Sequence, residues 1–416
     1  MSSAVVDFAS SKGVTQRGVV DGAVSYVVPT AHTSGWNRRK LGDLCYLDKQ
    51  QGIHRDLPYV GLEHIESGTG KFLGVLDGVS VKSSTFRFNP QHILYGRLRS
   101  YLNKVLLPDF TGHCSTEIFP IKPKNDVLRK FLFYWLTREQ TVQAVDATST
   151  GTRMPRANMG AVLEFELMVP SLKEQQCIVA ILDEAFAGIA KARVNAEQSL
   201  RNARELFESH LQTVFTRHGE GWVGRTLREI AVDFGRGKSK HRPRNDLKLY
   251  GGPYPFIQTG DVRGSRHLIT DYSQTYSEAG LTQSKLWPKG TLCITIAANI
   301  AETGILDFDA CFPDSVIGVV VNTKLTSTKF LEYLLQSFKA VLQAQGKGSA
   351  QANINLATFE NQRFPFPSLP MQKSIVAKLD ALAAETHRLE SIYQQKLAAL
   401  DELKQSLLDR AFSGAL

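Results

Sequence analysis

Two stretches of the sequence carry the hydrophobic pattern of long helices. In each stretch, apolar residues recur at alternating spacings of three and four, which is the heptad period of helices that pack side by side. Neither run contains proline. The expected packing positions are Ile178, Leu182, Ala185, Ile189, Ala192, Ala196, Ala203 and Leu206 in the first run, and Ile375, Leu379, Leu382, Leu389, Tyr393, Leu400, Leu403 and Leu407 in the second, which Thr386 and Lys396 interrupt.

The two predicted helices are expected to pair with each other. An alanine-rich face opposite a leucine-rich face allows close interdigitation. The first helix leads from one globular region to the next and the second begins after that region, so we predict that they run antiparallel. About 40 residues at 1.5 Å rise per residue give each helix a length of about 60 Å, which suits a spacer. A coiled-coil stalk for dimerisation is the alternative for a single stretch of this kind.

An internal repeat makes the spacer the better interpretation. Residues 170–183 match residues 367–380 at an offset of 197, and both segments open with Pro-Ser-Leu. Fainter matches at similar offsets continue through both halves of the chain, including Gly35-Trp36 with Gly221-Trp222 and Lys130-Phe131-Leu132 with Lys329-Phe330-Leu331. Between these matches the halves differ. The sequence therefore predicts a shared scaffold that presents two different surfaces.

These patterns predict an α+β fold. We expect two globular domains of mixed α/β structure, separated by two long antiparallel coiled-coil helices and related by a pseudo-twofold repeat. The predicted parts are an N-terminal extension at 1–35, a first domain at 36–168, a central helix at 169–217, a second domain at 222–365 and a C-terminal helix at 366–416.

Charge adds a preference for an anionic partner. The net charge is +9, and each predicted domain is basic, with 18 lysines and arginines against 13 acids in residues 36–168 and 17 against 12 in residues 222–365. Such a balance favours nucleic acid, although charge alone is weak support. No apolar run approaches the roughly 20 residues of a membrane helix. The first ten residues do not resemble a secretory signal, so we expect a cytoplasmic protein.

Basic residues cluster in predicted loops of both domains. In the first domain they follow the strand-like Ile93-Leu94-Tyr95, and in the second they crowd a glycine- and proline-rich segment. Arginine commonly reads guanine, whereas glutamine and asparagine favour adenine, but each of these side chains could instead contact phosphate or hold the backbone. The candidate DNA contacts are Lys71, Lys82, Arg97, Arg99, Tyr101, Lys104, Arg153, Arg156, Arg236, Lys238, Lys240, His241, Arg242, Arg244, Arg263, Arg266, Lys347, Gln351 and Asn353.

The sequence contains no recognisable catalytic motif. Gly237-Lys238-Ser239 has Val232 where a phosphate loop requires glycine. Cofactor-binding glycine fingerprints, His-Glu-x-x-His, Gly-x-Ser-x-Gly and the Asn-Pro-Pro-aromatic motif of adenine methyltransferases are also absent. The five cysteines lack zinc-ligand spacing and are expected to be reduced. We therefore expect no metal site, no bound cofactor and no catalytic residue.

The two Pro-Ser-Leu-x-x-Gln-x-x-Ile-Val-Ala-x-Leu-Asp segments resemble the specificity subunits of type I restriction-modification systems. Residues 59–65 (Tyr-Val-Gly-Leu-Glu-His-Ile), 96–102 (Gly-Arg-Leu-Arg-Ser-Tyr-Leu) and 255–261 (Pro-Phe-Ile-Gln-Thr-Gly-Asp) fit the same family. The resemblance covers nearly everything after Gly35.

The resemblance implies that each domain reads one half of a split DNA site and that the helices act as a ruler. It also implies two modification subunits, which bring S-adenosylmethionine, and restriction subunits, which bring ATP-driven, Mg-dependent translocation and cleavage. This chain would bind none of these cofactors. The alternatives are a tandem nucleic-acid-binding adaptor without methyltransferase partners and a self-sufficient nuclease.

Overall fold

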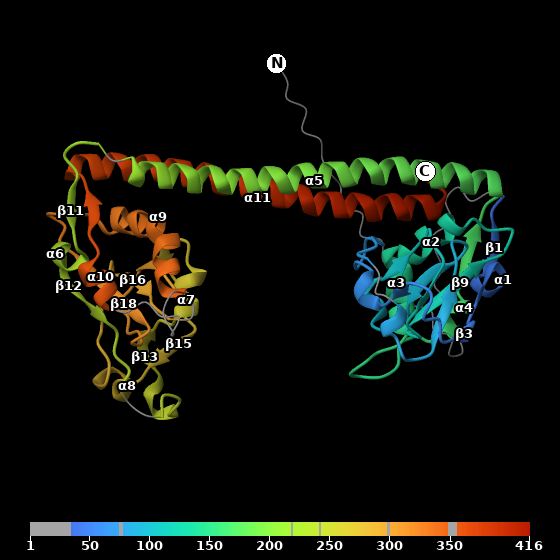
Figure 1. Ribbon diagram of the computed structural model, residues 1–416, viewed down its shortest axis with the longest axis horizontal. Helices are drawn as coiled ribbons and strands as arrows, with labels where there is room; N and C mark the ends of the chain where they lie inside the picture. Colours follow the sequence, from blue (N-terminus) through green and yellow to red (C-terminus); the bar gives the residue numbers. More distant parts are fainter. Residues whose placement is uncertain (1–34, 75–77, 218, 241–242, 298–299, 348–355) are drawn as a thin grey trace, which may run out of the picture. The chain divides into compact units, whose positions relative to one another are not determined.

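The structure is a computed structural model that describes residues 35–416 except 75–77, 218, 241–242, 298–299 and 348–355 (Figure 1). The described residues form two compact units: the first ends at Val194 and includes Leu397–Leu416, and the second is Asn195–Lys396. Each unit contains a globular domain of sheets and short helices together with parts of two 45-residue helices, α5 (Leu172–Thr216) and α11 (Leu369–Ser413). The predicted α+β fold with two mixed domains and two long helices is confirmed.

The first domain contains two four-stranded sheets with short helices around them. Their orders are β2-β9-β6-β7 and β3-β5-β8-β4, and in the second sheet β4 runs parallel to β8. The elements are β1 (Asn37–Lys40), α1 (Leu41–Leu44), β2 (Cys45–Leu47), β3 (Gln51–Gly52), β4 (Tyr59–Val60), β5 (Thr85–Phe88), β6 (Ile93–Gly96), β7 (Val105–Leu106), β8 (Gly112–Cys114), β9 (Ile118–Pro123), α2 (Arg129–Thr137), α3 (Glu139–Ala147), α4 (Met159–Leu163) and β10 (Glu166–Val169), with 3-10 turns η1 (Leu62–His64), η2 (Gly78–Ser80) and η3 (Ser100–Leu102).

The second domain is built on a five-stranded sheet of order β12-β18-β16-β17-β14, and helix α9 packs against its β17 strand. A separate two-stranded antiparallel sheet joins β13 and β15. The elements are β11 (Val223–Arg225), α6 (Leu227–Ile230), β12 (Ala231–Arg236), η4 (Leu247–Leu249), β13 (Tyr250–Phe256), α7 (Thr259–Gly264), β14 (Leu268–Ile269), β15 (Gln274–Tyr276), α8 (Glu278–Thr282), β16 (Leu292–Thr295), β17 (Thr303–Leu306), β18 (Val316–Val321), α9 (Thr328–Lys347), α10 (Leu356–Asn361) and β19 (Phe364–Phe366).

Both domains close in the same way before a long helix begins. The entering strand β1 pairs antiparallel with the leaving strand β10, and β11 pairs antiparallel with β19. Three residues after each leaving strand ends, α5 and α11 begin at the leucines of the Pro-Ser-Leu segments. In each half of the chain, the repeated segment is therefore the place where the globular domain ends and its long helix begins.

The long helices pair in opposite directions within each unit. In the first unit, Arg193 forms an ion pair with Asp401, and the ammonium of Lys404 lies 5.7 Å from the ring centre of Phe186. In the second unit, Arg204 forms an ion pair with Glu390 at 2.6 Å. The residue number rises on one helix as it falls on the other, so the predicted antiparallel pairing is confirmed.

Two of the predicted packing positions are wrong. Leu206 and Leu403 are 62% and 47% exposed. The residue after each makes the contact instead, since Phe207 packs against the second core and Lys404 lies over Phe186. An α-helix has 3.6 residues per turn, so a strict heptad pattern drifts by about 20° every seven residues. Over several heptads the buried face moves to the following position.

The remaining predicted positions face inward to different degrees. Ile178, Leu182 and Leu379 are buried, whereas Ile189, Ile375, Leu382, Leu389, Leu400 and Leu407 are half-buried. Thr386, which interrupts the apolar pattern, is itself buried. Many of these side chains pack into the cores of the globular domains: Ile178 and Leu182 belong to the first core, and Leu379 belongs to the second. The helices are therefore anchored in the domains as well as paired.

A buried glutamine attaches the start of each helix to its domain. Gln175 accepts a hydrogen bond from the backbone N–H of Leu128 at 2.8 Å and donates to the carbonyls of Asp126 and Pro170. In the second unit, Gln372 accepts from the hydroxyl of Thr326 at 2.9 Å and donates to the carbonyls of Leu325 and Pro367, both at 3.0 Å. Each amide thus satisfies backbone groups from the loop before α2 or α9 and from the end of the domain.

Two turns further along each helix, an aspartate completes the attachment. Asp183 accepts from the hydroxyl of Tyr134 and pairs with Lys130 at 2.6 Å. Asp380 accepts from Tyr333 and pairs with Lys329, both at 2.7 Å. Burial, followed by the neighbouring aspartate, raises the pKa of both tyrosines well above the usual range, so each remains a donor. We call each set of glutamine, aspartate, tyrosine and lysine a helix clamp.

The other end of each helix packs into the opposite domain of the repeat. Phe412 contacts Phe131 with ring centres 4.9 Å apart, and Phe215 contacts Phe330 at 5.6 Å. Leu408 and Leu211, one turn earlier, are also buried. Each unit therefore holds the first part of one helix and the last part of the other through equivalent residues.

We predict that Gln372→Ala destabilises the second unit. The substitution leaves buried backbone carbonyls and the Thr326 hydroxyl without their partner, which costs about 2 kcal/mol. The unfolding transition of the second unit should fall by roughly 4–8 °C in differential scanning calorimetry. Gln198→Ala on the exposed surface of α5 is the matched control and should shift no transition by more than about 1–2 °C. Equal shifts for the two variants would contradict a structural role for the buried amide.

Candidate nucleic-acid interface

The first domain places two segments that contain six of the candidate residues side by side. The segment after β6 contains Arg97, Arg99, Tyr101 and Lys104, and it lies beside the segment that contains Arg153 and Arg156. Backbone hydrogen bonds join the two segments, from Arg99 N–H to Pro155 O at 2.8 Å and from Ala157 N–H to Arg97 O at 2.9 Å. Residues about 55 positions apart in the sequence therefore form one paired loop surface.

Glu117 ties two of these arginines together. Arg97 contacts its carboxylate at 3.1 Å, and Arg156 contacts both oxygens at 2.7–3.0 Å. Burial opposes ionisation of Glu117, but the hydrogen bonds and charges of Arg156 and Arg97 outweigh it and hold the pKa below its usual range. The guanidinium of Arg97 also lies 4.8 Å from the ring centre of Phe119. Since both arginines are committed to these partners, we expect them to shape the loops rather than to read bases.

Arg99, Tyr101 and Arg153 are the exposed members of the group. Arg99 has a φ of 52°, a left-handed conformation that costs a non-glycine residue roughly 1–2 kcal/mol. Asn103 shares this conformation, and its side chain donates to Thr137 O at 3.0 Å. Strained backbone of this kind often occurs at functional sites. Among the described residues, Arg99 and Arg153 have no ion-pair partner, so both are available to a ligand.

The other candidates of the first domain make different contacts. The ammonium of Lys104 donates to the carbonyl of Leu62 at 2.7 Å and is thereby committed to the protein. Lys71 is exposed on a turn that touches the paired loops, since Gly68 N–H donates to Asn103 O at 3.0 Å. Lys82 is exposed after η2. Lys71 thus lies near the paired loop surface, whereas no described contact joins Lys82 to it.

Asp314 organises the basic segment of the second domain. Arg244 contacts both of its carboxylate oxygens at 2.9 and 3.0 Å, and Arg236 donates to its backbone carbonyl at 2.7 Å. Lys238 and Lys240 are exposed between them. A Cβ atom at Gly237 would lie 2.1 Å from Phe312 O, so only glycine allows the segment to pack this closely. The Gly-Lys-Ser sequence therefore has a packing role.

The structure describes the side chains of only some of the remaining candidates. Arg263 on α7 and Arg266 after it are exposed. Lys347 ends α9, and its side chain is outside the described part of the chain. The predictions for His241, Arg242, Gln351 and Asn353 also lie outside the described residues.

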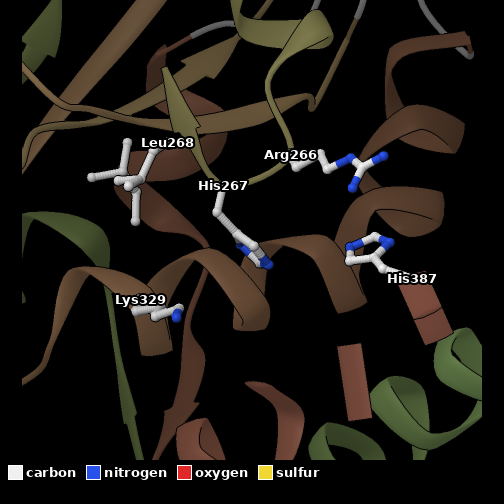
Figure 2. A pocket seen from close by; sticks show the side chains of 6 residues that line it. Arg266, His267, Leu268, Lys329 and His387 are labelled. Atoms are coloured by element: carbon white, nitrogen blue, oxygen red, sulfur yellow. The ribbon is translucent and has the colours of Figure 1, made fainter. Parts of the chain in front are cut away.

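A cavity of about 480 Å³ lies beside the second helix clamp. Figure 2 shows Arg266 and His387 on one side of it, with His267 between them and Lys329. Most of the polar groups already have partners. His267 bonds the buried Glu332 at 2.7 Å and lies 3.4 Å from the Tyr333 hydroxyl, Lys329 pairs with Asp380, and His387 contacts Glu390 at 3.1 Å. These commitments favour a role in holding α11.

The structure does not indicate a catalytic or metal centre in the described residues. No group of three histidine, cysteine, aspartate or glutamate residues within them is arranged to hold a metal ion. The five cysteines are free thiols, and four are buried. Burial raises the pKa of Cys45 to about 12, which suppresses thiolate formation. None of the described helices has both the length and the apolar content to cross a membrane.

The comparison with family models decides the assignment. The model for the type I restriction modification DNA specificity domain matches residues 33–197 and again residues 219–398. The chain belongs to this family. The two matches correspond to the two halves of the internal repeat, so each domain of this specificity protein is a DNA specificity domain.

Curated relatives and solved structures agree with this assignment. The EcoBI specificity subunit of Escherichia coli is 29% identical over 330 residues, covering 72% of this chain and 68% of that subunit. The EcoDI specificity subunit of Escherichia coli is 31% identical over 156 residues, which are 36% of this chain and only 34% of that subunit.

Two solved structures share the fold. A chain from a type I R-M system studied for complex assembly and conformational transition superposes with a TM-score of 0.81 at 22% identity, covering 94% of this chain and 100% of that one. The HsdS subunit from Thermoanaerobacter tengcongensis gives a TM-score of 0.60 at 22% identity, covering 93% and 99%. At this identity the structural likeness establishes the fold.

Three acidic residues that organise these surfaces were not among the residues predicted from the sequence. Glu117 and Asp314 hold arginines that are 20 to 78 residues away in the sequence, and Glu332 holds His267 from 65 residues away. No local motif marks these contacts. One signal was present: Asp314 lies 197 residues after Glu117, which is the offset of the repeat.

We predict that Arg156 and Arg153 have separable roles. Arg156→Ala removes the bidentate partner of Glu117, a carboxylate that is only 20% exposed, and should therefore lower the unfolding temperature of the first unit. Arg153→Ala should leave that temperature unchanged, because its side chain is exposed. It should weaken binding to duplex DNA and lower the slope of log affinity against log salt by about 1. The opposite pattern, with Arg153→Ala destabilising and Arg156→Ala affecting only DNA binding, would refute this division.

We predict that Glu332 makes the second unit less stable as pH rises. Burial raises the pKa of Glu332, partly opposed by His267, so the folded state holds this proton more tightly than the unfolded state. The free energy of unfolding should therefore fall as pH rises from about 4.5 through the raised pKa. Glu332→Gln cannot ionise and should lack this fall in urea titrations across the same pH range.

The matched control is Glu385→Gln on the exposed surface of α11. Arg388 lowers the pKa of Glu385, so any contribution of this residue is lost as pH falls, which is the opposite direction. If wild type and Glu332→Gln differ by the same amount at every pH, the buried carboxyl does not titrate as described.

Proposed function

We propose that this chain selects the DNA sites of a type I restriction-modification complex by reading a split, asymmetric sequence. Each domain contacts one half of the site, and the helices α5 and α11 set the number of base pairs between the halves. The observation that carries this proposal is the pair of equivalent helix clamps, which attach two domains with unlike basic loops to one antiparallel helix pair. Family membership supplies the context.

The loop chemistry supports contact with duplex DNA. Exposed Arg99 and Arg153 in the first domain, and Lys238 and Lys240 in the second, extend from loops held by Glu117 and Asp314. Phosphate contacts by such side chains provide affinity and register, whereas base edges provide sequence discrimination. Two unlike sets of loops would read two unlike half-sites, which makes the complete site asymmetric.

In this proposal, the chain is a targeting subunit that catalyses no reaction itself. Two modification subunits would supply S-adenosylmethionine and adenine methylation, and restriction subunits would supply ATP- and Mg-dependent translocation and cleavage in the cytoplasm. The long helices offer the surfaces on which these partners would dock. The relatives named above are specificity subunits, and the solved type I system was studied as an assembled complex.

Co-expression with the neighbouring genes tests the assignment. The tagged chain should co-purify with a methyltransferase, and single-molecule sequencing of the host genome should reveal a split adenine-methylation motif that disappears when this gene is deleted. Co-purification without a methyltransferase would favour a nucleic-acid-binding adaptor of another system. Metal-dependent cleavage by the isolated chain would instead indicate a nuclease.

We predict that exchanging one domain changes one half of the motif. Residues 36–168 would be replaced with the corresponding domain of a relative, leaving the helices and residues 222–365 intact. Because each domain is attached through its own clamp, the methylated motif should acquire one new half and keep the other and the gap. The reciprocal exchange of residues 222–365 is the control. A change in both halves after either exchange would contradict independent reading.

A further inference from the structure

A cleft in the second domain lies beside the basic segment and was not among the sequence-based candidates. It has a volume of about 410 Å³, and its lining residues are Asn245, Leu247, Tyr250, Gly251, Gln274 and Thr275. We call it the amide cleft, because asparagine and glutamine supply its longest polar side chains. One wall is the segment between Arg244 and β13, and the other is the β15 strand.

An irregular two-stranded sheet creates this hollow. β13 pairs with β15, but the register shifts between Tyr250 and Tyr254, so three residues bulge out of the pairing. Gly251 in this bulge has a φ of 81°, which favours glycine. The next residue, Gly252, packs so closely that a Cβ atom would lie 2.5 Å from Ser277 Cα. The bulge thus bends β13 away from a straight ladder and opens the cleft.

The walls of the cleft are held in place before any ligand binds. Tyr250 donates to Arg244 O at 2.6 Å, and Ser277 donates to Lys248 O at 2.6 Å. Beneath them, Phe256 and the buried Tyr276 stack with ring centres 3.9 Å apart. Gln258 donates to the side-chain carbonyl of Gln274 at 2.6 Å, which leaves the Gln274 amide NH₂ as a donor. A preformed site of this kind loses little entropy on binding.

The chemistry of the lining fits a nucleobase better than an anion or a metal. The six lining residues carry no charge, and they combine two amides, a hydroxyl, an aromatic ring and an apolar side chain. Asparagine and glutamine form paired hydrogen bonds with the N6 and N7 atoms of adenine, and apolar groups contact the thymine methyl. Leu247 at the cleft is 88% exposed and is available for such a contact. The cavity beside the helix clamp has no comparable set of free polar groups.

Positively charged side chains next to the cleft would contact DNA phosphates and so position the cleft on the duplex. Arg244 is anchored to Asp314 and provides the carbonyl that holds Tyr250, so the basic segment and the cleft wall are one structure. Lys240 and Lys248 are exposed on either side of Arg244 in sequence. Such residues would contact phosphates and position the neutral lining against base edges.

We propose that the amide cleft reads the second half-site, with Asn245 and Gln274 contacting the major-groove edge of an adenine–thymine pair. The inference rests on the proposed function and deepens it by naming residues and a base class. A merely structural cleft would tolerate changes to these exposed amides without any change in the sequence that is methylated.

The test uses the complete complex and maps methylated motifs by single-molecule sequencing of the host genome. Asn245→Ala and Gln274→Ala should relax one adenine–thymine position of the second half by about ten-fold or more, because each removes a hydrogen bond to that base pair. The first half and the gap should stay as in the parent. Asn361→Ala, which changes another exposed amide of the same domain, is the matched control and should leave the whole motif intact.

The isosteric variants Asn245→Asp and Gln274→Glu keep the test independent of folding. Each replaces an amide donor with an acceptor, so the preference at the affected position should move from adenine toward cytosine, whose N4 amino group donates. An unchanged motif in all four variants, or a loss of methylation that is uniform across sequences, would overturn the cleft assignment while leaving the proposed function standing. If the parent complex itself produced no split motif, both would fall.

Discussion

The buried amides of Gln175 and Gln372 are the constraint on which the rest of the structure depends. A buried amide without partners is costly, so each glutamine fixes the backbone groups that it bonds and thereby sets where its helix leaves the domain. The aspartate two turns later fixes the rotation of the helix through a tyrosine and a lysine. Phe412 and Phe215 anchor the opposite helix ends. The same attachment is thus made twice from equivalent residues.

In this arrangement, the residues that attach the helices are different from the residues proposed to contact DNA. The clamps lie among α2, α9 and the long helices, whereas the basic loops lie on other elements of each domain. The loops can therefore differ in sequence without disturbing the attachment. Within the loops, Glu117 and Asp314 perform similar work at equivalent positions, since each holds arginine side chains in place while neighbouring cations stay exposed. Affinity for a polyanion and an ordered loop surface are provided by different side chains.

Sequence patterns predicted the scaffold better than the surfaces, for physical reasons. The heptad spacing and the 197-residue offset are local and repeated, so they identified both helices and the segments that contain Gln175 and Gln372. The exposure of Leu206 and Leu403 was not predicted, because a heptad template ignores the drift of a 3.6-residue helix. The partners of Glu117 and the walls of the amide cleft come from distant segments that only the folded sheets bring together. No short-range pattern encodes such contacts.

The central claim is that equivalent clamps on an antiparallel helix pair let two domains read DNA independently. The most direct measurement is the methylation motif of a chain in which a second copy of residues 36–168 replaces residues 222–365. The grafted domain would meet Gln372 and Asp380 where it normally meets Gln175 and Asp183. The account predicts a symmetric motif, with each half the reverse complement of the other. A motif that stays asymmetric, or that retains the parent's second half, would contradict it.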